Sequence, residues 1–233
     1  MNDNNIDNFK RIDKNKILND INREMSNVKE EIEYEFKSTK NMIDEKINKC
    51  LDKTSFDSMT SDNYYTLNQL INRITMKSNH FDNFLKGKNK DIIDQLNLQE
   101  LQKDKENFEA NMRKLEELKF SNSVSSSSSS FIENKQESYT EGYLWWKTTK
   151  YKDVYDHDKT KAKYQQQINK FFEEGKQKSI QGIEANKNKI YYNIEGIFKK
   201  FNEEVTGFKN HINEFEKTVK DVENFIYQET GIK

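Results

Sequence analysis

The sequence predicts an all-α protein: an elongated antiparallel bundle or coiled coil of long helices, with one short β-hairpin inserted near residues 139–156. Three observations predict this fold. The 233 residues include no proline and only seven glycines, so little in the sequence forces a helix to end. Apolar residues recur at steps of three and four over long stretches. Both tryptophans, by contrast, lie side by side among residues that favour strands.

The composition fits long helices better than a compact globule or a disordered chain. Hydrophobic residues make up 33% of the sequence and charged residues 34%, whereas a globular domain is usually close to half apolar. A long helix in a bundle buries only a stripe, which accounts for the deficit. Disorder, the competing interpretation, is disfavoured by 15 phenylalanines, 11 tyrosines and the regular apolar spacing.

Residues 1–120 are predicted to form an N-terminal arm of three helices. The first, from about residue 6 to 53, carries the stripe Leu18, Ile21, Met25, Val28, Ile32 and Phe36. Residues 54–63 are rich in turn and capping residues and predict a break, with Ser61 or Asp62 as the N-cap of the second helix. Gly87 is expected to end that helix, and a third runs from about 91 to 120. Short loops imply antiparallel neighbours.

Residues 121–138 are predicted to be a serine-rich flexible linker, because such a tract buries too little apolar surface to become ordered. Residues 158–233 then form a long C-terminal helical arm with Asp158 as its N-cap. Gly175, Gly182 and Asn186 predict a bend or short break at 175–189. The most regular apolar stripe of the chain follows, at Ile190, Ile194, Ile197, Phe201, Val205, Phe208, Ile212, Phe215, Val219, Val222 and Ile226.

The two arms are predicted to pack as one intramolecular bundle. Phenylalanine and β-branched residues fill the C-terminal stripe, where a two-stranded coiled coil would favour leucine at half of the positions. Bulky aromatic side chains suit three or four helices better. A dimer through the same stripe is the alternative.

Residues 139–157 are predicted to be an aromatic β-hairpin, with strands near 143–146 and 151–155 and a polar turn at 147–150. A lone hairpin is marginal in water, so one face is expected to rest on the helices, with the tryptophans plugging the end of the bundle. The other face and the tip combine Trp, Tyr and Lys, which favour a membrane interface or an aromatic protein contact. The candidate contact residues are Tyr143, Trp145, Trp146, Lys147, Lys150, Tyr151 and Lys152.

Residues 143–158 and the heptad stripe after them resemble the helical trunk of dynamin-like large GTPases. In that family the trunk drives self-assembly and a tip element meets the membrane, so the resemblance implies assembly and membrane contact. The sequence departs from the family in having no G-x-x-x-x-G-K-[ST] phosphate loop. The nearest string, GKQKS at Gly175, lacks the preceding glycine. The resemblance therefore does not extend to nucleotide hydrolysis.

No residues are predicted to be catalytic, to bind a cofactor or to ligate a metal. His80, His157 and His211 lie in distant segments, and the aspartates beside His157 suit helix capping better than metal binding. Cys50 falls on the predicted core face of a helix, which favours packing over reactivity. The 39 basic and 40 acidic residues nearly cancel, which disfavours a nucleic-acid partner. No small-molecule substrate is expected.

The sequence therefore predicts a non-enzymatic helical scaffold or assembly protein that contacts a protein partner, or itself, through its helical faces and the aromatic hairpin. The alternative is a peripheral membrane-binding or membrane-remodelling protein whose Trp-rich hairpin meets an anionic membrane surface. One cysteine, no apolar leader and no run of about 18 apolar residues predict a cytoplasmic location, at membranes in the alternative case.

Overall fold

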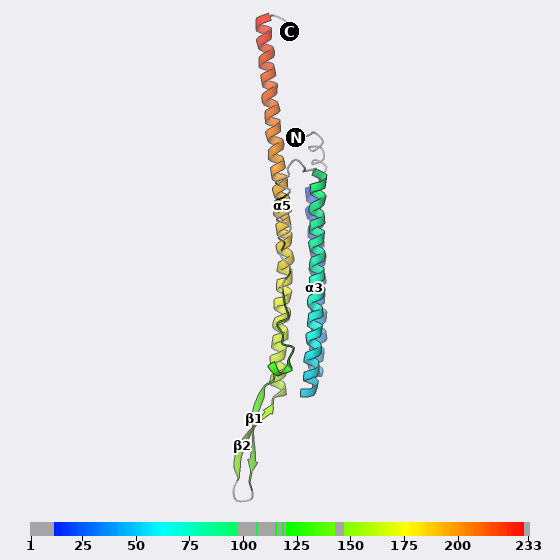
Figure 1. The fold of residues 1–233 in the computed structure, drawn as a ribbon, viewed down its shortest axis with the longest axis vertical. Coiled ribbons are helices and arrows are strands. Elements are labelled where there is room, and N and C mark those ends of the chain that lie inside the picture. Colours follow the sequence, from blue (N-terminus) through cyan, green and yellow to red (C-terminus); the bar gives the residue numbers. More distant parts are fainter. Residues whose placement is uncertain are drawn as a thin grey trace. The chain divides into compact units, whose positions relative to one another are not determined.

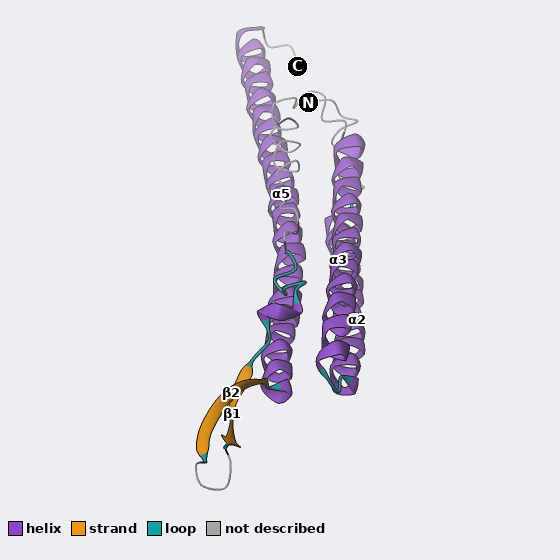
Figure 2. Ribbon diagram, turned by 60° about the horizontal axis from the view of Figure 1, so that its bottom comes forward, coloured by secondary structure: helices purple, strands orange, loops and turns teal. Residues whose placement is uncertain are grey.

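The computed structural model describes residues 12–96, 106, 115, 118, 120–142 and 147–230. This part of the chain is mostly helical, as predicted, with one two-stranded antiparallel sheet between the second and third long helices (Figures 1 and 2). The helices are α2 (Lys14–Lys49), α3 (Lys53–Leu96) and α5 (His157–Thr230), and a short 3-10 helix is η2 (Ser128–Ser130). The strands are β1 (Asn134–Glu141) and β2 (Thr148–Tyr155).

The chain divides into two compact units, and each long helix contributes to both. The first unit comprises Met1–Asn22, Phe84–Leu115 and Asn186–Lys233. The second comprises Arg23–Asn83 and Glu116–Ala185, and so contains the hairpin.

In the second unit, polar pairs between helices fix their directions. As the residue number of the partner on α3 or α5 increases, the residue number of its partner on α2 decreases. α2 is therefore antiparallel to both helices, as the short connections predicted. The pairs are Arg73 with Glu35 (2.8 Å), Lys77 with Glu31 (2.7 Å), Gln165 with Asp44 (2.7 Å) and Lys176 with Glu33 (3.5 Å).

The core of the second unit is lined by apolar side chains at helical spacing from all three helices. Aromatic rings dominate it: Phe36 packs against Phe120 and Phe172, with ring centroids 6.0 and 6.1 Å apart. The rings of Phe56 and Phe131 both meet Tyr164 edge-on, at 5.6 and 4.9 Å. Buried aliphatic residues complete this core, among them Val28, Ile32, Ile43, Ile47, Leu67, Leu70, Ile74, Ile168 and Ile183.

The predicted break at residues 54–63 is wrong, because α3 begins at Lys53 and runs through them. Its N-cap is Asp52, whose Oδ1 accepts the Ser55 backbone N–H at 2.7 Å, while the Ser55 hydroxyl accepts the Asp52 N–H at 3.0 Å. The hydrogen bond that the Ser55 backbone N–H donates to the Asp52 carboxylate lowers the pKa of Asp52. The turn-forming residues of this segment predicted a break, but Phe56 and Met59 lie at helical spacing and their side chains are buried in the core. Packing overrides the weak local preference.

Two glycine-based predictions are also wrong. α3 continues through Gly87, which is exposed, and buries Ile92 one turn later. α5 is continuous through residues 175–189. A Cβ at Gly175 would come within 3.1 Å of the Phe36 ring, and one at Gly182 within 3.1 Å of Leu118. These glycines therefore let neighbouring side chains approach α5 closely rather than breaking it.

The segment between Phe120 and β1 packs locally on the second unit. Val124 and Phe131 are buried, and Asn122 donates to the Tyr64 carbonyl at 3.4 Å. Serine hydroxyls bond one another, as Ser125 and Ser130 do at 2.9 Å. The last part of the predicted linker, residues 134–138, belongs to β1, so the hairpin begins earlier than predicted.

The hairpin exists, but its parts differ from the prediction. Residues 148–150, predicted as the turn, form the start of β2 and pair with residues 139–141 of β1. The predicted first strand, residues 143–146, lies outside the described residues. β1 was missed because its sequence, NKQESYTE, has no apolar alternation. Gly142, which follows β1, has a φ of 133°, a conformation that favours glycine.

In the first unit, α2 again runs antiparallel to α5. The Lys14 Nζ lies 2.6 Å from Glu195 Oε2, and the Tyr191 hydroxyl donates to the Leu18 carbonyl at 2.7 Å. α3 joins them through Lys88, whose Nζ lies 3.1 Å from an Asp20 carboxylate oxygen. The buried apolar residues are Ile12, Ile21, Leu85, Ile92, Ile93, Ile190, Ile194, Phe198 and Phe201.

Candidate interaction surfaces

The hairpin is exposed on both faces over nearly its whole described length. All eight residues of β1 are exposed, and in β2 only Val154 and Tyr155 are half-buried. The prediction that one face rests on the helices is therefore wrong for these strand residues. The hairpin is instead anchored at its base, where the Asp156 N–H donates to the Glu133 carbonyl at 2.8 Å. The Glu133 N–H donates to the Thr160 hydroxyl at 2.9 Å.

One face of the hairpin carries most of its charges. Residues directly opposite in the pairing register share a face, and Glu137 opposes Lys152 while Tyr139 opposes Lys150. Lys150 forms an ion pair with Glu141, and Lys152 lies over the Tyr139 ring at 6.0 Å. Two of the candidate cationic contacts thus have local partners, which reduces the positive field available to an anionic surface.

The other lysine of this face, Lys135, was not among the predicted contacts. Its Nζ lies 3.1 Å from a Glu137 carboxylate oxygen, which raises its pKa. The predicted contacts Lys147 and Tyr151 are exposed, Tyr151 by 67%. Tyr143, Trp145 and Trp146 lie outside the described residues. The structure therefore brings Lys150 and Lys152 together on one strand and leaves Tyr151 on the opposite face.

The base of α5 joins the end of α2 through a small polar cluster. The helix begins at His157, and its N-cap is Asp156, whose Oδ1 accepts the Lys159 N–H at 3.1 Å. The predicted N-cap, Asp158, instead lies in the first turn. The Cys50 carbonyl accepts from His157 Nε2 and from Lys161 Nζ, both at 3.2 Å. The Tyr155 hydroxyl lies 3.3 Å from His157 Nδ1. The two hydrogen bonds to the Cys50 carbonyl satisfy an acceptor at the C-terminal end of α2.

A buried polar pair lies in the second unit, on α3 and α5. The Tyr164 hydroxyl and both amide atoms of Asn63 are buried and make no hydrogen bond to the described residues. Burial raises the pKa of Tyr164 to about 12, and the Asn63 side chain nearby offsets this rise only in part. The two side chains are not in position to form a hydrogen bond with each other. Such a pair costs stability and offers no base or nucleophile.

The C-terminal part of α5 carries an apolar stripe that no described residue covers. Every side chain from 209 to 225 is exposed, and Figure 1 shows this orange-to-red part of α5 continuing past the other described elements of its unit. Phe215 is 70% exposed, and Ile212, Val219 and Val222 are also exposed. Val205 and Phe208, where the stripe leaves the core, are half-buried. We call residues 205–225 the α5 tail.

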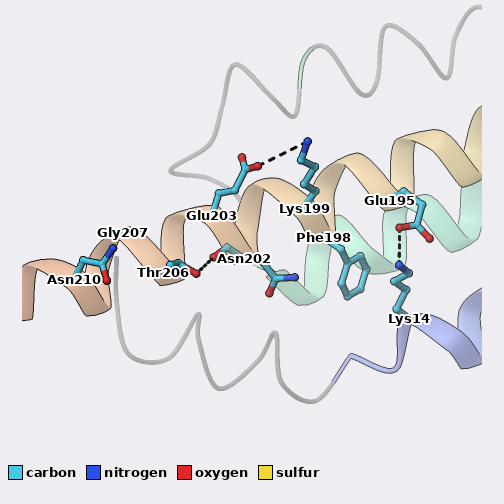
Figure 3. Close-up of a pocket in the computed structure, with 9 residues that line it drawn as sticks. All are labelled: Lys14, Glu195, Phe198, Lys199, Asn202, Glu203, Thr206, Gly207 and Asn210. Carbon is cyan, nitrogen blue, oxygen red and sulfur yellow. Dashed lines mark hydrogen bonds and ion pairs between the residues drawn. The ribbon is translucent and has the colours of Figure 1, made fainter.

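A surface hollow lies beside the start of the α5 tail (Figure 3). Its charged groups are already paired: Lys14 with Glu195 at 2.6 Å, and Lys199 with Glu203 at 3.9 Å. The remaining lining residues are Phe198, Asn202, Thr206, Gly207 and Asn210. Nothing in this set forms a nucleophile–base pair or a cation-binding site.

The described residues hold no cluster of three or more His, Cys, Asp or Glu side chains that could ligate a metal. His80 lies 3.7 Å from Glu24, and His211 lies 3.7 Å from Glu214 one turn away. Cys50 is buried, as its place on the core face predicted. None of the described helices has an apolar run of the kind that crosses a membrane.

No family model, curated protein or solved structure matches the chain. The resemblance to the trunk of dynamin-like GTPases therefore stays a hypothesis that rests on the sequence.

The sequence prediction placed the candidate contact residues in the hairpin and treated the α5 tail as part of one continuous stripe, with a dimer through that stripe as the alternative to an intramolecular bundle. A signal was present in the spacing. From Tyr164 to Phe201 the buried positions of α5 advance by roughly 3.7 residues a step, close to an 11-residue repeat. From Ile194 onward the apolar residues alternate between steps of four and three, a heptad repeat that Phe225 flanks at position g. The heptad therefore begins inside the buried core, about three turns before Val205.

Proposed function

We propose that this protein is a non-enzymatic helical scaffold or assembly protein that binds a protein partner through an exposed helical face. The observation that carries the proposal is the α5 tail: a helix that presents an apolar heptad stripe along more than four turns, with its side chains exposed. Contiguous exposed apolar surface of this kind marks an interaction site in a water-soluble chain.

The rest of α5 makes the tail a prepared binding element. An isolated helix must nucleate before it can bind, and short helices are marginal in water. Here residues 157–201 are held in the two units by buried side chains, so the tail extends a helix that already exists. The partner therefore meets an ordered surface, which lowers the entropic cost of association.

Cross-linking of the full-length protein in the cells that produce it tests this proposal. Lys209, Lys217 and Lys220 lie on the tail and are exposed, so they are expected to form cross-links to lysines of another chain. The variant Phe215→Asp should lose these cross-links. Asn210→Asp adds the same charge at an exposed position off the stripe and should keep them. A tail without intermolecular cross-links in the wild-type protein contradicts the proposal.

A second candidate function, peripheral membrane binding through the hairpin, is favoured by one specific observation. Two strands exposed on both faces end at a connection whose sequence is Tyr-Leu-Trp-Trp, at residues 143–146. Tryptophan and tyrosine are enriched at membrane–water interfaces. The local ion pair of Lys150 makes insertion of aromatic residues a better basis for this function than charge attraction.

Sedimentation with vesicles of phosphatidylcholine and phosphatidylserine tests the membrane function. The wild-type protein should pellet with the vesicles, and Trp145→Ala/Trp146→Ala should remain in the supernatant. Tyr192→Ala, which removes an exposed aromatic residue from α5, should behave like the wild type. A wild-type protein that stays in the supernatant contradicts the membrane function.

A further inference from the structure

We propose that the partner of the α5 tail is the α5 tail of a second copy of this chain, packed antiparallel to it. This inference rests on the proposed assembly function and names its partner. In heptad notation, Val205, Ile212 and Val219 occupy position a, and Phe208, Phe215 and Val222 occupy position d. An a/d stripe is the narrow seam of a two-helix contact, whereas the buried positions of α5 before Ile194 follow a different repeat.

The neighbours of Phe198 select the antiparallel orientation. Phe198 lies one heptad before Val205 on the same face of α5, and Lys14 of α2 lies over its ring at 5.9 Å. A parallel second α5 would continue along this face into the space that α2 occupies. In the antiparallel register described below, a second α5 overlaps mainly with the tail, and only its residues 226–230 lie beside residues 197–201 of the first copy.

Side-chain sizes favour antiparallel pairing, because every a position of the tail is aliphatic and both phenylalanines occupy d positions. In antiparallel pairs, a positions of one helix pack with d positions of the other. With Ile212 opposite Phe215 of the second copy, Phe208 faces Val219 and Val205 faces Val222. Each phenylalanine thus meets an aliphatic residue, so large and small side chains alternate across the seam, which favours dense packing.

Charges at the flanking e positions favour the same register. There, Lys209 of each copy lies nearest Glu216 of the other, which gives two opposite-charge pairs per dimer. A shift of one heptad in one direction would place the two Lys209 side chains against each other. A shift in the other direction would place the two Glu216 side chains against each other, although it would also pair Lys209 with Glu223. The proposed register is the one of the three that has opposite-charge pairs and no like-charge contact at these positions.

Sedimentation equilibrium of the full-length protein tests the inference, and charge exchange tests its geometry. The wild type should form dimers at micromolar concentration, and Phe215→Asp should be monomeric with unchanged helicity. Lys209→Glu and Glu216→Lys should each weaken dimerisation about tenfold, because two attractive pairs become two repulsive ones. Lys209→Glu/Glu216→Lys should restore wild-type affinity. In a parallel dimer Lys209 would face Glu204 of the other copy, so the exchange would not restore binding.

Spin labels on the outer face of the tail give an independent measure of orientation. At position 210 the two labels should be offset by about 11 Å along the helix axis, and at position 224 by about 32 Å. Equal distances at the two positions would overturn the antiparallel register. So would a double variant that binds no better than the single variants.

The outcome separates this inference from the proposed function. A wild-type protein that is monomeric at about 100 μM, a concentration at which micromolar dimers are populated, overturns self-pairing. If its tail lysines still cross-link to another protein in cells, the assembly function stands with a different partner. If they do not, both proposals fail.

Discussion

The buried and exposed parts of α5 are alike in residue type but differ in what covers them. From Ile183 to Phe201 the stripe is made of isoleucine and phenylalanine with one asparagine, Asn186, and the side chains at its central positions are buried. From Ile212 to Phe225 isoleucine, valine and phenylalanine continue at similar spacing, and every one of these side chains is exposed. Hydrophobic periodicity therefore predicts where a helix has an apolar face, and a second property is needed to predict what covers it.

That second property is the repeat length, together with the small residues that accompany it. The buried part includes Gly175, Ser179 and Gly182, which let rings and leucines approach the helix closely. The exposed part has no small residue on its stripe and keeps a strict heptad. The part of α5 that packs within its own chain and the part proposed to pair with a separate helix thus differ in their content of small residues and in the spacing of their apolar residues.

The largest expected difference between the two parts comes from placing a carboxylate on each. Ile194 is fully buried, so Ile194→Asp should lower the free energy of unfolding by about 3 kcal/mol or more. Phe215→Asp should change it by less than about 0.5 kcal/mol, measured by urea denaturation at a concentration where the protein is monomeric. Equal losses in the two variants would show that the tail is buried in the folded monomer.

A smaller effect is expected from alkaline pH, through a buried residue of the same helix. The folded-state pKa of Tyr164 is about 12, above the unfolded value near 10, so the unfolded chain loses this proton first. The contribution of the neutral Tyr164 to the free energy of unfolding is fully present below pH 10. As pH rises from 10 towards 12, the free energy of unfolding decreases by about 2 kcal/mol. Urea denaturation at pH 9, 10 and 11 should show this loss in the wild type and less of it in Tyr164→Phe.

Tyr192, which is 79% exposed on α5, provides the control for that measurement. Tyr192→Phe should keep the wild-type pH dependence. At neutral pH Tyr164→Phe should be as stable as the wild type or slightly more stable, because it removes a buried hydroxyl without a hydrogen-bond partner. A strongly destabilised Tyr164→Phe would mean that this hydroxyl is satisfied in solution.

The smallest effects are expected from adding a methyl group at two glycines of α5. Gly175→Ala should destabilise the protein by about 1 kcal/mol, because the Phe36 ring is held by Phe120 and Phe172 and has little room to move. Gly196 has open space around it, so Gly196→Ala should stabilise by about 0.5–1 kcal/mol through helix propensity. Thermal unfolding of both variants provides the test, and stabilisation by Gly175→Ala would contradict the close packing.

The sequence predicted the helical architecture and the existence of a hairpin because both leave periodic or compositional marks. It misplaced boundaries where local and tertiary preferences conflict. Residues 54–63 carry turn formers, yet Phe56 and Met59 are pulled into the core. Gly175 and Gly182 resemble helix breakers until their ring and leucine neighbours are known. Those neighbours come from distant parts of the chain, which local propensity does not include.

The candidate site was harder to predict than the fold. The pairing of Lys150 with Glu141 depends on a strand register that the polar sequence of β1 does not reveal. The α5 tail was part of a predicted stripe, but its exposure depends on where the partner helices end. Lys14 beside Glu195 marks that end in the structure, and the sequence contains no equivalent landmark.

Hydrogen exchange measured at several protein concentrations tests most directly whether the tail is an assembly surface. The account predicts that amides of residues 190–201 are protected equally at all concentrations, since their cover comes from the same chain. Amides of residues 209–225, which are helical but uncovered in the described part of one chain, should exchange faster than those of 190–201 at low concentration and become further protected in the micromolar range as a second copy binds. Tail amides that exchange at the same rate at every concentration up to about 100 μM would contradict self-pairing of the tail.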